Sequence, residues 1–141
     1  MTQEHVAASA ERTGASERIL TQLRIAPRAE EVGRARHWFH GCLRTWPDDA
    51  QAAAEAVFGE ITANAIRHGR GEVTLTVALS GRLVRCHVRD GSWRRPRCLG
   101  RPGAECEDGR GMVIVAALAD DWGVRRHLRG KTIWFEVRAP A

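Results

Sequence analysis

The feature that most constrains the fold is a pair of alternating segments joined by a tight turn. In residues 72–79 and 82–90 every second side chain is apolar: Val73, Leu75, Val77, Leu79, Val84, Cys86 and Val88. Ser80 and Gly81 lie between the two segments. Because successive side chains of a strand point to opposite faces, this pattern predicts a β-hairpin with one buried and one exposed face.

Two segments before the hairpin have helical spacing. Apolar residues recur at steps of three and four in residues 27–46, where Pro27 marks the expected start and the helix is expected to stop near Trp46, before Pro47. The second segment begins with Asp48 or Asp49 as N-cap, has an Ala-rich interior that favours a helix, and ends at His68. Gly69 is expected to close it.

The remaining segments complete the pattern. Residues 18–25 alternate and predict a first, edge strand, while residues 1–17 have no apolar period and predict a loose, disordered tail. Residues 91–108 predict a long loop, and the apolar run from Met112 predicts a short buried helix. A second hairpin is expected from Trp122–His127 and Thr132–Arg138, with three side chains facing inward: Ile133, Phe135 and Val137.

This order of elements predicts the fold class. Interleaved helices and antiparallel hairpins favour an α+β, two-layer α/β sandwich, with a mixed, mostly antiparallel sheet and the helices on one face. The 141 residues are enough for one domain with a core, which we expect over residues 18–141.

Composition excludes several classes of protein. The longest apolar run is the eight residues Met112–Ala119, whereas a membrane-spanning helix needs roughly 20, so no membrane partner is expected. The first 17 residues lack the apolar segment of a signal peptide. The four cysteines (Cys42, Cys86, Cys98 and Cys106) are irregularly spaced, which favours reduced thiols and a cytoplasmic location. Cys98 and Cys106 flank part of the expected loop, so a redox pair is the alternative there.

The excess of basic over acidic residues would by itself suggest an acidic partner such as nucleic acid, since the net charge is +5 and the pI is about 9.8. However, only one of the 22 basic residues is lysine, and the arginines are spread along the whole chain beside abundant alanine. This distribution disfavours a dedicated nucleic-acid-binding function.

A polar stripe marks the second predicted helix. Glu60, Asn64 and His68 are four residues apart, so they lie on one side of the helix, next to the expected core positions Ala54, Val57, Ile61 and Ala65. An amide oxygen in this position suits Mg²⁺ together with phosphate oxygens. An ordinary surface stripe is the alternative.

An acidic residue ends the second strand of the first hairpin. Asp90 follows Val84, Cys86 and Val88 in the same alternation, so its carboxylate should face the buried side and needs a partner there, such as a purine amino group. The alternative is a turn-forming aspartate before Gly91.

Two glycines precede the apolar helix. Gly109, Arg110 and Gly111 stand where free N–H groups would favour a phosphate, and arginines of the preceding loop add positive charge: Arg94, Arg95, Arg97 and Arg101.

Four motifs together resemble a known family. FGEITANAIRHG (58–69) resembles the N-box of the GHKL, or Bergerat-fold, ATP-binding superfamily; VRDGS (88–92) resembles its first glycine box and DGRGM (108–112) its second. ALADDWGVRRHLRGKTIWFEV (117–137) resembles the ending of small single-domain anti-sigma-factor serine/threonine kinases of the actinobacterial type. The resemblance implies the Bergerat ATP-binding fold, with ATP and Mg²⁺ as cofactors.

The resemblance also implies roles for individual residues. Glu60 matches the general base, Asn64 the Mg²⁺ ligand, and Asp90 the residue that binds the adenine amino group. The other implied nucleotide-binding residues are His68, Ser92, Gly109, Arg110, Gly111, Met112 and the late threonine near adenine, Thr132. The loop 91–108 matches the lid.

The first glycine box departs from the family pattern. Ser92 and Arg94 stand where glycines are expected, with Trp93 between them, and this bulk would narrow the nucleotide pocket.

The resemblance implies an ATP-binding regulatory protein that transfers the γ-phosphoryl group to a serine or threonine of a partner and regulates transcription by partner switching. The expected partner is an anti-sigma-factor antagonist, with a sigma factor as the alternative client, and relatives of this type often form homodimers. A catalytically silent, nucleotide-responsive binding module and a basic nucleic-acid-binding domain are the alternatives.

Overall fold

A single antiparallel sheet organises the molecule. The computed structural model describes residues 9–13, 16–92 and 109–140, with the backbone alone for 9–19 and 109–112. The six strands follow the order β1-β2-β3-β4-β6-β5, and every described pairing is antiparallel. Their bounds are β1 Ser9–Thr13, β2 Ser16–Ile25, β3 Val73–Ser80, β4 Leu83–Asp90, β5 Asp121–His127 and β6 Gly130–Arg138.

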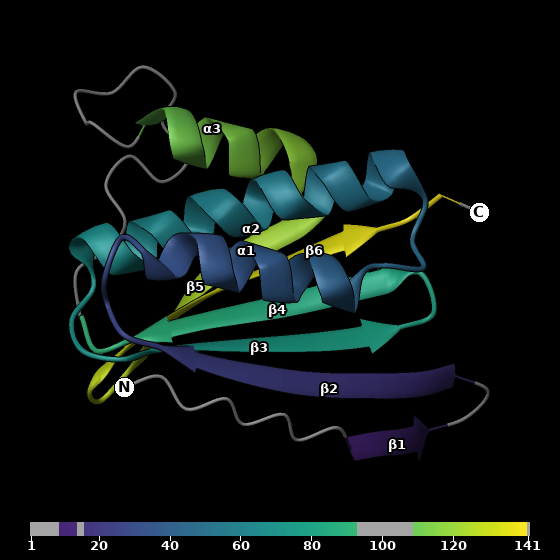
Figure 1. Ribbon diagram of the computed structural model, residues 1–141, viewed down its shortest axis with the longest axis horizontal. Coiled ribbons are helices and arrows are strands. Elements are labelled where there is room, and N and C mark those ends of the chain that lie inside the picture. Colours follow the sequence, from purple (N-terminus) through teal and green to yellow (C-terminus); the bar gives the residue numbers. More distant parts are fainter. Residues whose placement is uncertain (1–8, 14–15, 93–108, 141) are drawn as a thin grey trace.

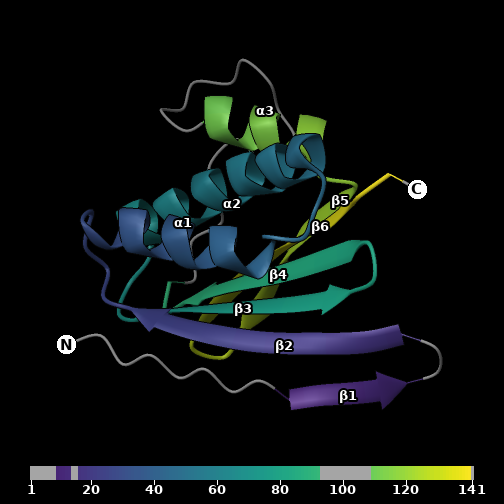
Figure 2. The same ribbon diagram turned by 45° about the vertical axis from the view of Figure 1, so that its right-hand side comes forward.

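Three helices of the described part of the chain cover one face of this sheet. They are α1 Glu31–Cys42, α2 Asp48–His68 and α3 Gly109–Leu118. Figure 1 and Figure 2 show all three on the same side, with α2 between α1 and α3, while the opposite face of the sheet carries none of the described helices. The predicted two-layer α+β sandwich is confirmed.

The core lies between the two layers. Alternate residues of β3, β4 and β6 are buried against the helices, as the hairpin patterns predict. Phe39 of α1 and Phe58 of α2 stack with ring centroids 4.2 Å apart, and Phe135 of β6 meets Phe39 edge-on at 6.3 Å. These aromatic contacts fix α1 and α2 relative to each other and to the sheet.

The N-terminal part of the sheet differs from the prediction. Ser9–Thr13 forms β1, and β2 begins at Ser16, so the prediction of a loose tail is wrong for these residues. Strand β2 lies between β1 and β3, so it is not an edge strand. An added edge strand is held by backbone hydrogen bonds, which need no apolar period in the sequence.

The helix ends agree with the prediction to different degrees. Helix α1 begins at Glu31, four residues after Pro27, because residues 28–30 form a turn that precedes it, and it ends at Cys42, before Trp46. Helix α2 has the predicted span, although Pro47 occupies the N-cap position. After α2, Gly69 is extended (φ −81°, ψ 178°), and its N–H donates to the carbonyl of Ala65.

Helix α3 is less buried than predicted. Val115 is fully buried, but Val113 and Leu118 are 42% and 41% exposed, because α3 packs against α2 and β5 at the border of the helical layer (Figure 1). Its first turn contains Gly109, Arg110 and Gly111, which were expected to precede the helix. None of the helices in the described part of the chain combines the length and apolar character needed to cross a membrane.

Candidate functional site

The polar stripe of α2 borders the core, as predicted. Ala54, Val57, Ile61 and Ala65 are fully or almost fully buried, and Glu60, Asn64 and His68 lie on the adjoining side. Asn64 is only 7% exposed, and its Oδ1 is buried without a hydrogen-bond partner among the described residues. A buried amide oxygen without a partner is costly, so this atom is a strong candidate for contact with a ligand.

Glycines bring the end of α2 against Asp90. A Cβ atom on Gly69 would lie 2.9 Å from Cγ of Asp90 and 2.1 Å from the carbonyl oxygen of Ala65. A Cβ atom on Gly130 of β6 would lie 2.1 Å from the carbonyl oxygen of Asp90. Only glycine permits these approaches, so Gly69 and Gly130 hold Asp90 beside the α2 stripe.

The Asp90 carboxylate faces the helix-covered side, as the alternation predicts. Its Oδ1 accepts the backbone N–H of Ser92 at 2.6 Å, and Ser92 is itself buried. Its Oδ2 lies 3.3 Å from Nζ of Lys131, with the two side chains 0% and 2% exposed, although Oδ2 forms no hydrogen bond of good geometry. The chain therefore supplies a cation at the place where a purine amino group was expected.

Lys131 is the residue that sequence reasoning missed. It is opposite Asp90 in the register of β4 and β6, and it is buried on the same face as Ile133, Phe135 and Val137. The signal was available, because this lysine is in phase with those three inward-facing side chains.

The placement expected for Thr132 is not observed. Thr132 alternates to the helix-free face of the sheet, where its Oγ1 lies 2.6 Å from Nε2 of His127. It lines a polar hollow on that face with Thr74 and Arg89, so it is separated by the sheet from the Asp90 carboxylate.

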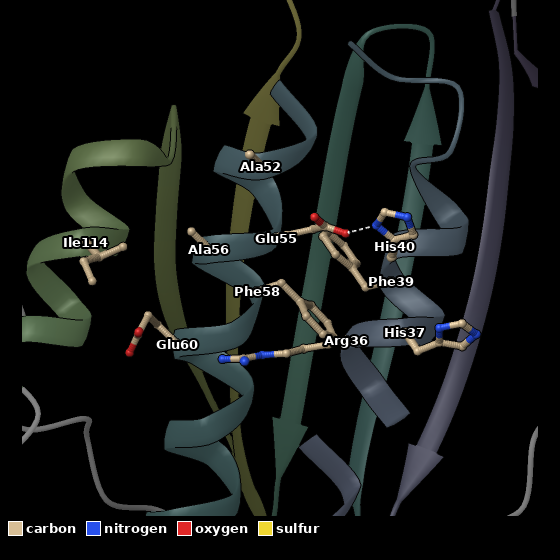
Figure 3. Close-up of a pocket in the computed structure, with 10 residues that line it drawn as sticks. All are labelled: Arg36, His37, Phe39, His40, Ala52, Glu55, Ala56, Phe58, Glu60 and Ile114. Carbon is tan, nitrogen blue, oxygen red and sulfur yellow. Dashed lines mark hydrogen bonds and ion pairs between the residues drawn. The ribbon is translucent and has the colours of Figure 1, made fainter. Parts of the chain in front are cut away.

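Glu60 lies at a cavity of about 570 Å³ on the outer side of the helical layer. The cavity is lined by Arg36, His37, Phe39, His40, Ala52, Glu55, Ala56, Phe58, Glu60 and Ile114. Figure 3 shows Glu60 pointing toward the α3 side, and Arg36 of α1 extending across α2. A Cβ atom on Gly59 would lie 2.8 Å from Nη2 of Arg36, so Gly59 leaves room for this crossing.

The second glycine box forms the start of α3. Gly109, Arg110, Gly111 and Met112 are all helical, and α3 packs against α2, so free N–H groups at this helix start lie near the stripe-bearing helix. The side chains of Arg110 and Met112 lie outside the described residues, as do the loop arginines, Cys98 and Cys106.

The described cysteines are ordinary thiols. Burial raises the pKa of Cys42 to about 11, and burial followed by the proximity of Cys42 raises the pKa of Cys86. In the part of the chain that the structure describes, His, Cys, Asp and Glu side chains form no group of three or more suited to a metal ion. A divalent cation would depend on Asn64 together with oxygens of a bound ligand.

Comparison with known proteins identifies the family of the domain. A family model described as histidine kinase-like ATPase domain matches residues 25–137. No curated protein matches the sequence.

Two solved structures share the fold at 17% identity. The RsbU and RsbW domains of a Mycobacterium tuberculosis protein superpose with a TM-score of 0.63, covering 86% of this chain and 33% of that one. The histidine kinase domain of a blue-light activated kinase from Erythrobacter litoralis superposes with a TM-score of 0.53, covering 92% of this chain and 66% of that one. Since the family model spans most of its length, the chain belongs to the histidine kinase-like ATPase domain family.

Proposed function

We propose that this ATPase-family domain is a regulatory protein kinase that binds ATP with Mg²⁺ beside α2 and transfers the γ-phosphoryl group to a serine or threonine of a partner protein. Family membership implies ATP binding, and the arrangement of the predicted site residues supports the finer part of the proposal. Asp90 lies at the proposed base end, and Asn64 and Glu60 follow along α2 toward the proposed phosphate end.

The observation that carries the proposal is the buried Oδ1 of Asn64, which has no hydrogen-bond partner in the part of the chain that the structure describes. An amide oxygen is a hard ligand of the kind that Mg²⁺ uses together with phosphate oxygens. Bound there, Mg²⁺ would offset the negative charge of the phosphates. The first turn of α3 would direct backbone N–H groups of Gly109, Arg110 and Gly111 toward the same charge, and His68 continues the stripe toward Asp90.

Glu60 is the proposed general base. It is half-buried at the rim of the cavity between α1, α2 and Ile114 of α3, which leaves a route for a hydroxyl-bearing segment of a partner. As the hydroxyl oxygen bonds to the γ-phosphorus, the Glu60 carboxylate would take the hydroxyl proton, and ADP leaves with the electrons of the broken phosphorus–oxygen bond.

The proposed partner is an anti-sigma-factor antagonist-like protein, with a sigma factor as the alternative client. Phosphorylation of the antagonist would change which partner the kinase holds, and so regulate transcription in the cytoplasm. The presence of an RsbW domain in a structural neighbour supports this class of function, and a homodimer is the expected assembly.

Transfer of radiolabel from γ-labelled ATP to a co-purified partner tests the proposal. Glu60→Gln should reduce the transfer rate by about 100-fold or more, the usual size of a lost general base. Glu55→Gln is the matched control, since Glu55 lines the same cavity but pairs with His40. Undiminished transfer by Glu60→Gln would show that the base is assigned wrongly.

A second function is favoured by one specific observation. Lys131 holds the Asp90 carboxylate inside the proposed base end, and Ser92 fills a position where a glycine was expected. These features suit a nucleotide-responsive binding module without catalysis. ATP binding with no label transfer in the same assay would support this module over the kinase.

A further inference from the structure

The helix-free face of the sheet carries a row of arginines at one end. The strand register places five residues side by side across β2, β3, β4, β6 and β5: Arg24, Thr74, Arg89, Thr132 and Arg125. Neighbouring strands are about 4.8 Å apart, so the three arginines of this arginine row are roughly 10 Å apart at the backbone, with a threonine between each pair.

The row lies in a hollow whose described lining carries more positive than negative charge. All five residues line a cavity of about 500 Å³, and among its described lining residues Glu72 is the only acidic side chain. The three arginines are exposed, and none forms an ion pair with a described residue. Elsewhere on the same face an arginine is neutralised, since Arg85 pairs with Glu136.

One arginine of the row also affects a titratable neighbour, His87. His87 lies one row further along β4, and its pKa is lowered by burial and then by the charges of Arg85 and Arg125, against the opposing effect of Glu136. Of the arginine row, Arg125 acts on His87, and the three arginines on the lining of the hollow would favour an anion there.

We infer that the arginine row is a docking site for an acidic segment of a partner protein. Guanidinium groups bind carboxylates by paired hydrogen bonds, and the threonine hydroxyls between them offer further donors. This inference concerns the opposite face of the sheet from the nucleotide site and does not depend on ATP binding.

Other occupants fit this face less well. A second copy of the chain would bring its own arginine row against this one, and like charges would repel. Single-stranded nucleic acid prefers aromatic platforms for its bases. Among the described residues, Trp134 is the only aromatic side chain near the row apart from histidines. Its ring lies over Gly123, and Cζ of Arg85 is 6.0 Å from the ring centroid.

Binding of fluorescent poly-L-glutamate of about 20 residues, followed by anisotropy, tests the inference. The triple variant Arg24→Gln, Arg89→Gln and Arg125→Gln should bind at least about tenfold more weakly than the wild type. The matched control changes three exposed arginines outside the hollow, Arg44, Arg82 and Arg138, to glutamine; it removes the same net charge and should weaken binding less than threefold.

The other outcomes would overturn the inference. Equal losses in the two triple variants would show that net charge alone attracts the probe. Tighter, row-dependent binding of a 20-nucleotide oligo-dT would point to nucleic acid instead. A wild-type dimer that dissociates only in the row variant, measured by sedimentation, would identify a second copy as the occupant.

Discussion

The two faces of the sheet place charged side chains in opposite surroundings, and neighbouring residues of the same strand belong to different faces. Asp90 and Lys131 face the helices, where they form a buried ion pair. Their neighbours Arg89 and Thr132 face the other way, into an open hollow where Arg89 has no ion-pair partner among the described residues. At this end of the sheet, the same two strands therefore hold a compensated pair of charges under the helices, whereas the charge of Arg89 on the open face has no partner among the described residues.

Burial decides whether a charge in this molecule needs a partner within the chain. Under the helices a charge must be paired, because the cost of an isolated buried ion is several kcal/mol. In solvent a guanidinium needs no partner within the chain and remains available to bind one from outside.

Removal of Lys131 should give the largest effect. Lys131→Met keeps an apolar stem but leaves the Asp90 carboxylate buried without its cation, and we expect a loss of about 3–5 kcal/mol in the free energy of unfolding. Urea denaturation measures this change.

Two further variants control the experiment. Arg89→Gln, one residue from Asp90 but exposed, should change stability by less than about 0.5 kcal/mol. The double variant Asp90→Asn, Lys131→Met should recover most of the loss, because no buried charge remains. A Lys131→Met protein as stable as the wild type would contradict the buried pair.

The close approach of α2 to Asp90 should give the next largest effect. In Gly69→Ala the new methyl group meets the Ala65 carbonyl and Asp90, so we expect a loss of about 1–3 kcal/mol in thermal or urea unfolding. Gly33→Ala is the matched change at an open position of α1, and it should stabilise the protein by about 0.5–1 kcal/mol. The same sign of change in both variants would argue against this packing.

The smallest expected effect is the pH dependence of stability that arises from His87 on the helix-free face. Because the pKa of His87 is lowered in the folded state, the unfolded chain takes up its proton first as the pH falls below 6.5. The contribution of His87 to stability is thus present above pH 6.5 and is lost as the pH falls toward its folded pKa. Denaturation of wild type and His87→Gln between pH 7.5 and 5 should show a shallower pH dependence in the variant, and parallel curves would contradict this assignment.

Sequence periodicity predicted the sheet, α2 and the inward direction of Asp90, because each depends on apolar side chains at regular steps. It missed β1, whose place at the edge is set by backbone pairing. It also predicted more burial for α3 than the structure has, because an apolar run does not indicate that the helix lies at the border of its layer.

For the candidate site, the sequence predicts the positions of some residues correctly and of others not. The α2 stripe and Asp90 follow from spacing, and the structure brings them together through Gly69, a contact that no local pattern encodes. Thr132 was placed near adenine by resemblance, whereas the alternation that turns Ile133 inward already turns Thr132 outward and Lys131 inward. Periodicity within this chain was the better guide at that position.

Calorimetric titration with ATP and Mg²⁺ decides whether a magnesium-nucleotide site lies beside α2. We predict that the wild type binds, that Asn64→Ala loses at least about tenfold in affinity without losing stability, and that Gln51→Ala on the same helix binds as the wild type does. Equal affinity in wild type and Asn64→Ala, or no binding by the folded wild type, would contradict a magnesium-nucleotide site beside α2.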